Sequence, residues 1–150
     1  MPGQRCSYAS LLLTALLSST ASAEPSAFCT SFQAVRDAGN AHFETIRGRE
    51  ISEPIFEPAL ALSGSSSCMM SSMEGTDSYA CTWDGLSDEA EAKAVAEALD
   101  QEILSCVPSA RRRDGGLIVL DDDMIVTVMA AGTAVTVSIV RQAGAFRALR

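Results

Sequence analysis

The sequence predicts an α+β fold in which two helices pack on one face of a mostly antiparallel sheet of about five strands. Three observations predict it. Apolar residues recur at helical spacing in two segments, residues 25–47 and 87–107. A β-hairpin pattern occupies residues 68–83, and three stretches of alternating apolar residues follow the second helical segment. The expected element order is therefore α-β-β-α-β-β-β, braced by disulfides.

The first helix is expected to run from Pro25 to Arg47, and Gly48 after it is a typical stop signal. Gly39–Asn40 weakens the pattern and predicts a kink or a break. Residues 49–67 are expected to form a loop, because two prolines and a serine run disfavour a regular helix and a central strand. The apolar stripe of the helix consists of Phe28, Phe32, Val35, Gly39, His42 and Ile46.

The hairpin has two plausible registers, which depend on its turn. A loop at Glu74–Gly75 places Cys68 opposite Cys81, whereas a loop at Gly75–Thr76 places Met70 opposite Cys81. The second loop has the better type II′ chemistry because glycine comes first. Only the first register allows a Cys68–Cys81 disulfide. Both registers bury the same face, formed by Cys68, Met70, Tyr79, Cys81 and Trp83.

The second helix is expected to begin at a Ser87 cap and to end before Pro108. Acidic residues in its first turn, Asp88 and Glu89, suit the positive end of the helix dipole. Its buried stripe would end at Cys106, which therefore faces inward. This stripe consists of Ala92, Val95, Leu99, Ile103 and Cys106.

The C-terminal part of the chain alternates in the manner of strands. A turn at Ala131–Gly132 would set Val128 opposite Val135 and Val126 opposite Val137, so that apolar residues meet on one face. The same turn would pair Met124 with Ile139, and Thr127 with Thr136 on the other face. The expected strands are Leu117–Leu120, Met124–Ala130 and Ala134–Val140.

Residues 1–23 have the pattern of a secretory signal peptide, and residues 24–150 are expected to form a single α+β domain. Arg5 precedes a short apolar run, and Ala21-Ser22-Ala23 is a small-residue cleavage site. A buried N-terminal helix is the alternative. The apolar run is shorter than the roughly 20 residues that span a membrane, so we expect no membrane anchor and a periplasmic or secreted location.

Cleavage would leave 10 basic against 19 acidic residues, a net charge of −9. Nucleic acids and anionic membrane surfaces repel such a protein, so neither is an expected partner. A basic protein partner is compatible with this charge.

Four cysteines follow the signal peptide, and an even number in an exported chain indicates disulfides. A zinc site is disfavoured, because the gaps between successive cysteines are 38, 12 and 24 residues rather than those of paired CxxC ligands. Three connectivities are open. If Cys68 pairs with Cys81, Cys29 is left to pair with Cys106, which ties the two helices together.

Residues that could carry chemistry are few. His42 is the single histidine, and its place on an apolar stripe favours a packing role over catalysis. No serine lies in a GxSxG motif, and the sequence predicts no catalytic constellation. Asp121-Asp122-Asp123 lacks the spacing of a calcium loop and reads as a solvated turn.

Two further clusters could bind ligands. Met69, Met70 and Met73 offer thioethers of the kind that suit Cu(I), but strand alternation separates Met70 from the other two, which favours core packing. Arg111–Arg113 form a basic island, which could dock a partner but is typical of a solvated loop.

The sequence therefore favours a small exported protein-binding domain without enzymatic activity, such as an inhibitor or an immunity-type protein. Its partner is an unknown protein. A periplasmic carrier of a small ligand or of copper is the alternative. No cofactor is expected.

Overall fold

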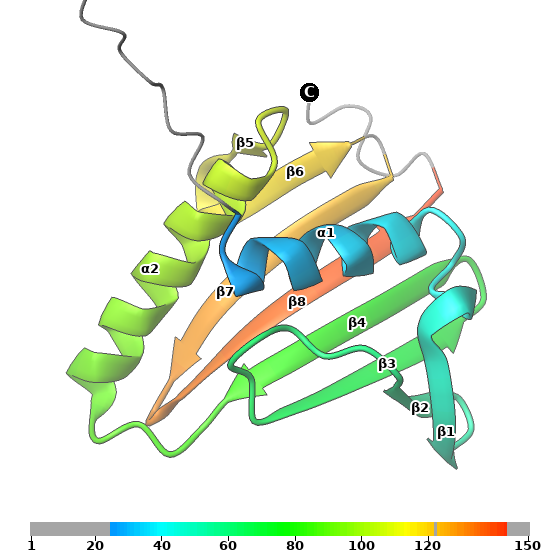
Figure 1. Ribbon diagram of the computed structural model, residues 1–150, viewed down its shortest axis with the longest axis horizontal. Helices are drawn as coiled ribbons and strands as arrows, with labels where there is room; N and C mark the ends of the chain where they lie inside the picture. Colours follow the sequence, from blue (N-terminus) through cyan, green and yellow to red (C-terminus); the bar gives the residue numbers. More distant parts are fainter. Residues whose placement is uncertain (1–24, 122, 144–150) are drawn as a thin grey trace, which may run out of the picture.

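The structure is a computed structural model and describes residues 25–121 and 123–143; the signal peptide expected over residues 1–23 lies outside this range. Two helices pack on one face of an antiparallel sheet (Figure 1). The helices are α1 (Ala27–Gly39) and α2 (Glu89–Cys106), with short 3-10 helices η1 (Glu44–Ile46) and η2 (Asp114–Gly116). The strands are β1 (Arg47–Ser52), β2 (Ile55–Pro58), β3 (Ser67–Met73), β4 (Thr76–Trp83), β5 (Arg111–Arg112), β6 (Leu117–Asp121), β7 (Met124–Ala131) and β8 (Ala134–Gln142).

The α+β class and the packing of two helices on an antiparallel sheet are confirmed, but the expected number of about five strands is wrong. The sheet has eight strands in the order β1-β2-β3-β4-β8-β7-β6-β5. Three of them were not expected. β1 begins at Arg47, the last residue of the expected helix, and most of β1 and all of β2 lie in the segment 49–67 that was expected to be a loop. Pro54 lies in the turn between these strands and Pro58 is the last residue of β2, while β5 has only two residues.

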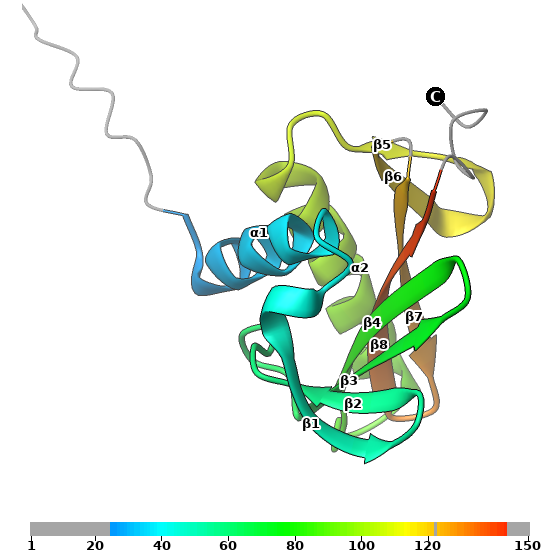
Figure 2. The ribbon, with the colours of Figure 1, turned by 90° about the vertical axis from the view of Figure 1, so that its right-hand side faces the viewer.

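The chain passes twice through the same arrangement, a helix followed by a four-stranded meander. The first half comprises α1 and β1 to β4, and the second half comprises α2 and β5 to β8. The last strands of the two halves, β4 and β8, pair antiparallel at the centre of the sheet. The strand order is therefore symmetric about this pair. Both helices lie on the same side, which leaves the opposite side of the central strands uncovered by any described element (Figure 2).

The first helix is shorter than expected and ends at Gly39 rather than Arg47. A Cβ atom at position 39 would lie 2.5 Å from the Met124 Cε atom, so a side chain there would displace the Met124 methyl group. The chain then turns through His42 and Phe43, which have left-handed φ angles of 55° and 56°. This turn places the Phe43 ring fully inside the core and leaves His42 exposed.

The second helix begins one residue later than expected, with Asp88 rather than Ser87 as its N-cap. The Asp88 side chain accepts a hydrogen bond of 2.8 Å from the Glu91 N–H group. The Ser87 N–H and hydroxyl groups both donate to the Glu91 carboxylate at 2.6 Å. The two reciprocal interactions resemble a capping box and fix the first turn.

This capping arrangement predicts a pH dependence. The hydrogen bonds from Ser87 lower the pKa of Glu91 below its ordinary value of 4.5. A carboxylate with a lowered folded pKa contributes stability that is present above the unfolded pKa and is lost as pH falls through the folded pKa. We expect an NMR titration to give Glu91 a midpoint below 4.5, and Ser87→Ala to move that midpoint upward. An unchanged midpoint in Ser87→Ala would contradict the capping role.

The two hairpins differ in how well the sequence predicted them. In the β3–β4 hairpin Cys68 lies opposite Cys81, which is one of the two registers that the sequence left open, although the other has the better type II′ turn chemistry. The expected β7–β8 register is wrong by two residues, because the turn is Gly132–Thr133 and Val128 pairs with Val137. An even shift keeps every side chain on its original face, so the apolar face is unaffected. The displaced pairs are Val126 with Ile139, Met124 with Arg141 and Thr127 with Ser138.

The core lies between the helices and the inner face of the sheet. Phe32 is fully buried, and its ring stacks 5.8 Å from that of Phe28, which in turn lies 6.2 Å from Trp83. Tyr79 is also fully buried, and its hydroxyl donates a 2.7 Å hydrogen bond to the Leu60 carbonyl. Burial raises the pKa of Tyr79, so the phenol stays protonated as a hydrogen-bond donor.

Candidate functional site

Two disulfides brace the fold. Cys29 of α1 is joined to Cys106 of α2 with a Cα–Cα distance of 5.2 Å, and Cys68 is joined to Cys81 across the β3–β4 hairpin. This pairing is one of the three connectivities that the sequence left open. The four thiols are consumed as cross-links, so their place in the structure is that of braces rather than of nucleophiles or metal ligands.

His42 is not a packing residue, and the expectation that it lies on a buried helical stripe is wrong. Its side chain is 58% exposed, and its Nδ1 atom lies 2.6 Å from the Oδ2 atom of Asp77. Asp77 is a buried acidic residue on the inner face of β4, and its Oδ1 atom accepts a 2.7 Å hydrogen bond from the Ser72 hydroxyl. The Arg141 Nη1 atom lies 3.0 Å from the imidazole.

This polar cluster contains serine, histidine and aspartate, but it does not have the order of a catalytic triad. In a triad the serine contacts the histidine, which takes its proton. Here Ser72 donates to Asp77, so the aspartate lies between the other two groups. The arrangement ties the turn after α1 to the β3–β4 hairpin. The sequence contained a signal for it, because Asp77 has the same strand parity as Tyr79 and Cys81.

The three methionines of β3 do not converge on one point. Met70 is buried in the core, whereas Met69 and Met73 are 55% and 62% exposed on the opposite face. Met69 and Met73 are four residues apart on one strand, which separates their Cα atoms by about 13 Å. That distance is too long for both sulfurs to bind one copper ion. The structure therefore gives no support to copper binding by this cluster.

The expected aspartate turn forms the β6–β7 connection, and Asp122 lies outside the described residues. The Asp123 N–H group donates a 3.0 Å hydrogen bond to the Asp121 side chain, and the Asp123 carbonyl accepts 2.9 Å from the Gln142 N–H group. Within residues 25–121 and 123–143, no group of three acidic, histidine or cysteine side chains is arranged to hold a metal ion.

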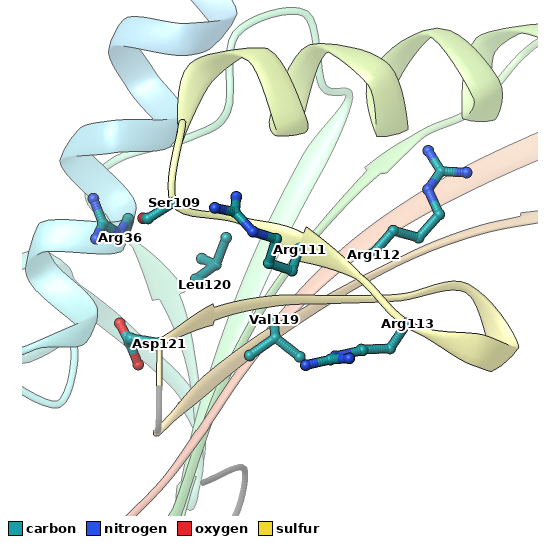
Figure 3. A pocket seen from close by; sticks show the side chains of 8 residues that line it. All are labelled: Arg36, Ser109, Arg111, Arg112, Arg113, Val119, Leu120 and Asp121. Atoms are coloured by element: carbon teal, nitrogen blue, oxygen red, sulfur yellow. The ribbon is translucent and has the colours of Figure 1, made fainter. Parts of the chain in front are cut away.

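The basic island is more ordered than a solvated loop. Arg111 and Arg112 form β5, which pairs with β6 at the edge of the sheet. Arg112 forms an ion pair with Asp100 of α2. These residues line a pocket of about 590 Å³ together with Arg36 of α1, which sequence reasoning did not connect with them (Figure 3). The complete lining is Arg36, Ser109, Arg111, Arg112, Arg113, Val119, Leu120 and Asp121.

The most extensive candidate site is the uncovered face of the four central strands, which we call the outer face. None of the residues that form the outer face carries a charged side chain. Three of its members are large exposed apolar residues: Met69, Met73 and Met129. The outer face consists of Ser67, Met69, Ser71, Met73, Thr76, Ser78, Ala80, Thr82, Ile125, Thr127, Met129, Ala131, Ala134, Thr136, Ser138, Val140 and Gln142.

Hydroxyl groups are paired across the outer face. The Ser71 and Ser78 hydroxyls are hydrogen-bonded at 2.8 Å, and those of Thr82 and Thr136 at 3.4 Å. Cross-strand pairs of this kind stabilise a sheet and keep short side chains close to it. The result is a surface of small uncharged residues from which methionines project.

No helix among the described residues is both long enough and apolar enough to cross a membrane. No family model, no curated protein and no solved structure matches the chain.

Proposed function

We propose that this chain is an exported binding protein without catalytic activity that recognises another protein through the outer face. One observation carries the proposal: four adjacent strands present an uncharged surface in a protein with 19 acidic and 11 basic residues. A sheet face that remains in water carries polar residues, and here those residues are uncharged and interrupted by exposed methionines. Loss of charge at the centre with methionine exposed is typical of the core of a protein interface.

The size of the outer face supports a protein rather than a small ligand as its occupant. The four strands span roughly 20 Å by 25 Å, from a strand spacing of about 4.8 Å and a rise of about 3.3 Å per residue. A stable interface buries about 800 Å² on each partner. These dimensions give about 500 Å², so a partner that also contacts the residues bordering the four strands would bury an area of this order.

The chemistry of the face and of its border specifies the partner. The contact surface of the partner is uncharged, because any charge placed on the outer face would lose water without gaining a counter-charge. Exposed acidic residues border the face at both ends of the β3–β4 hairpin, with Glu74 in its turn and Asp84 just after β4. Basic groups at the rim of the partner would speed the encounter.

The bracing suits this role. A rigid surface loses little conformational entropy on binding, and the two disulfides hold the helices and the central hairpin in place. Structural disulfides also favour an oxidising compartment, in agreement with the signal peptide expected from the sequence. Inhibition of a hydrolase or neutralisation of a toxin is the role that such a surface would serve.

The proposal is tested by placing a charge at the centre of the outer face. Ser138 lies on β8 between Ala80 and Thr127. We expect Ser138→Lys to weaken retention of the partner from an exported-protein fraction at least tenfold, because a lysine charge buried in the interface would be unpaired. Quantitative mass spectrometry of proteins retained by wild type and variant measures this loss.

A matched control is Ala94→Lys, which adds the same charge at an exposed position on α2. It should retain the partner as wild type does, and both variants should unfold within about 0.5 kcal/mol of wild type. Equal retention by Ser138→Lys and Ala94→Lys would contradict the proposal. So would a dimer of this chain in solution that Ser138→Lys converts to monomer, since the occupant would then be a second copy.

A further inference from the structure

The arginine-lined pocket is an independent feature of the molecule, because it lies at the β5–β6 edge rather than on the central strands. Four of its eight lining residues are arginines, and one is an aspartate. This concentration of positive charge occurs in a chain with a formal net charge of −8. The volume of about 590 Å³ falls within the range of small-molecule sites.

Arg36 comes from α1 and the other three arginines from β5 and the residue after it, and the four side chains have different contacts. Arg112 is paired with Asp100, and in Figure 3 its side chain points away from the others. The Arg111 Nη1 atom donates to the carbonyls of Pro108 at 2.9 Å and Ala110 at 2.8 Å. These contacts fix the Arg111 guanidinium while leaving its other N–H groups free to donate.

Arg36 provides the second cation. It projects from α1, and in Figure 3 the Arg36 and Arg111 side chains lie on either side of Ser109. The Arg36 Nε atom is buried without a hydrogen-bond acceptor among the described residues, and no described acidic side chain forms an ion pair with this arginine. A partly buried guanidinium without a counter-charge favours an anion beside it.

We propose that this pocket binds a small organic oxyanion, with Arg36 and Arg111 holding a phosphate or carboxylate group beside the Ser109 hydroxyl. The planar N–H groups of arginine match the paired oxygens of both anions. Val119 and Leu120 add an apolar wall. The ligand therefore carries an apolar part as well as its charge.

Asp121 is the one acidic residue of the pocket, and it makes the proposal testable in both directions. Its carboxylate accepts the hydrogen bond from the Asp123 N–H group at 3.0 Å. An asparagine can keep this hydrogen bond through its side-chain oxygen but carries no charge. Asp121→Asn should therefore strengthen binding of an anion, whereas loss of an arginine should weaken it.

The experiment is an NMR titration of the folded protein with phenyl phosphate, benzoate and inorganic phosphate. We expect phenyl phosphate or benzoate to shift amide signals of residues 109–121, with the better of the two identifying the anionic group. Arg36→Gln and Arg111→Gln should each weaken that ligand at least tenfold, and Asp121→Asn should bind it more tightly.

Arg49→Gln is the control, because Arg49 is a 79% exposed arginine that pairs with Glu57 at the other edge of the sheet. It removes the same charge from the protein and should leave the affinity unchanged. Equal weakening by Arg36→Gln and Arg49→Gln would show only a net-charge effect and would overturn the proposal. The proposal would also be overturned if none of the three probes, each at about 10 mM, shifted the amide signals of residues 109–121.

If Arg36→Gln does not fold, the Arg111→Gln and Asp121→Asn variants decide the matter. Opposite changes in affinity support the pocket, and unchanged affinity in both variants overturns it. This experiment tests the pocket separately from the outer face, because Ser138 and the other residues of the outer face do not line the pocket.

Discussion

Replacement of both Cys29 and Cys106 by alanine is expected to lower the free energy of unfolding by about 4.5 kcal/mol, from the loop-closure entropy of a cross-link over 77 residues. This disulfide joins the first residues of α1 to the last turn of α2 and so connects the two halves of the chain. The Gln33 side chain also donates a 2.9 Å hydrogen bond to the Cys106 carbonyl, which depends on the same alignment. Urea unfolding under non-reducing conditions measures the loss.

The second disulfide supplies the comparison. Cys68 and Cys81 are 13 residues apart, so the same relation gives a smaller loss of about 3 kcal/mol for the Cys68→Ala/Cys81→Ala variant. The seven paired positions of the β3–β4 ladder also hold these strands together. A larger loss from removal of the hairpin disulfide than from removal of the helix disulfide would contradict this ranking.

Phe32→Ala is expected to lower the free energy of unfolding by about 3 to 5 kcal/mol. Phe32 has no exposed surface, and its ring lies in the cluster that joins α1 to the inner face of the sheet. The alanine would leave a cavity beneath α1 and remove the stacking contact with Phe28. The midpoint of urea unfolding, with the slope unchanged, measures the effect.

Two substitutions on the same helix serve as controls. Phe32→Leu fills most of the cavity and should cost less than half as much, since the loss grows with cavity volume. Gln33→Ala removes an exposed side chain from the neighbouring position and should cost about 1 kcal/mol through its hydrogen bond to Cys106. If Phe32→Ala and Phe32→Leu lowered the free energy of unfolding equally, this would contradict the placement of the Phe32 ring in a packed core beneath α1.

The sequence predicted the elements that have strong local periodicity. Both helical segments, the β3–β4 hairpin and the three C-terminal strands follow from apolar spacing, although the turn residues did not determine the register of either hairpin. The hairpin register also explains why Cys68 and Cys81 lie within disulfide reach. Such features are local, because they depend on residues that are close in the chain.

The features that the sequence did not predict depend on contacts between distant segments. β1 and β2 extend the sheet at its edge, where proline is tolerated, although their residues resemble a loop. The break at Gly39–Asn40 was predicted, but the sequence did not show that position 39 packs against Met124, which is 85 residues away in the chain. No local pattern reports such an approach.

The candidate sites show the same division. Arg111–Arg113 were noticed as a basic island, but Arg36 joins them only because α1 crosses the sheet near β6. Alternation along each strand could have shown an uncharged face. The uncharged faces of separate strands form one surface only because β4 pairs with β8 and so joins the two halves of the chain.

The position of the partner on the surface tests the account most directly. A photoreactive amino acid placed at Met69, in the outer face, should form a covalent adduct with the partner, and the same group at the exposed Ala94 of α2 should form none. Mass spectrometry of the adducts reads out both positions. Adducts at Ala94 but not at Met69 would place the partner on the helices and contradict recognition through the outer face.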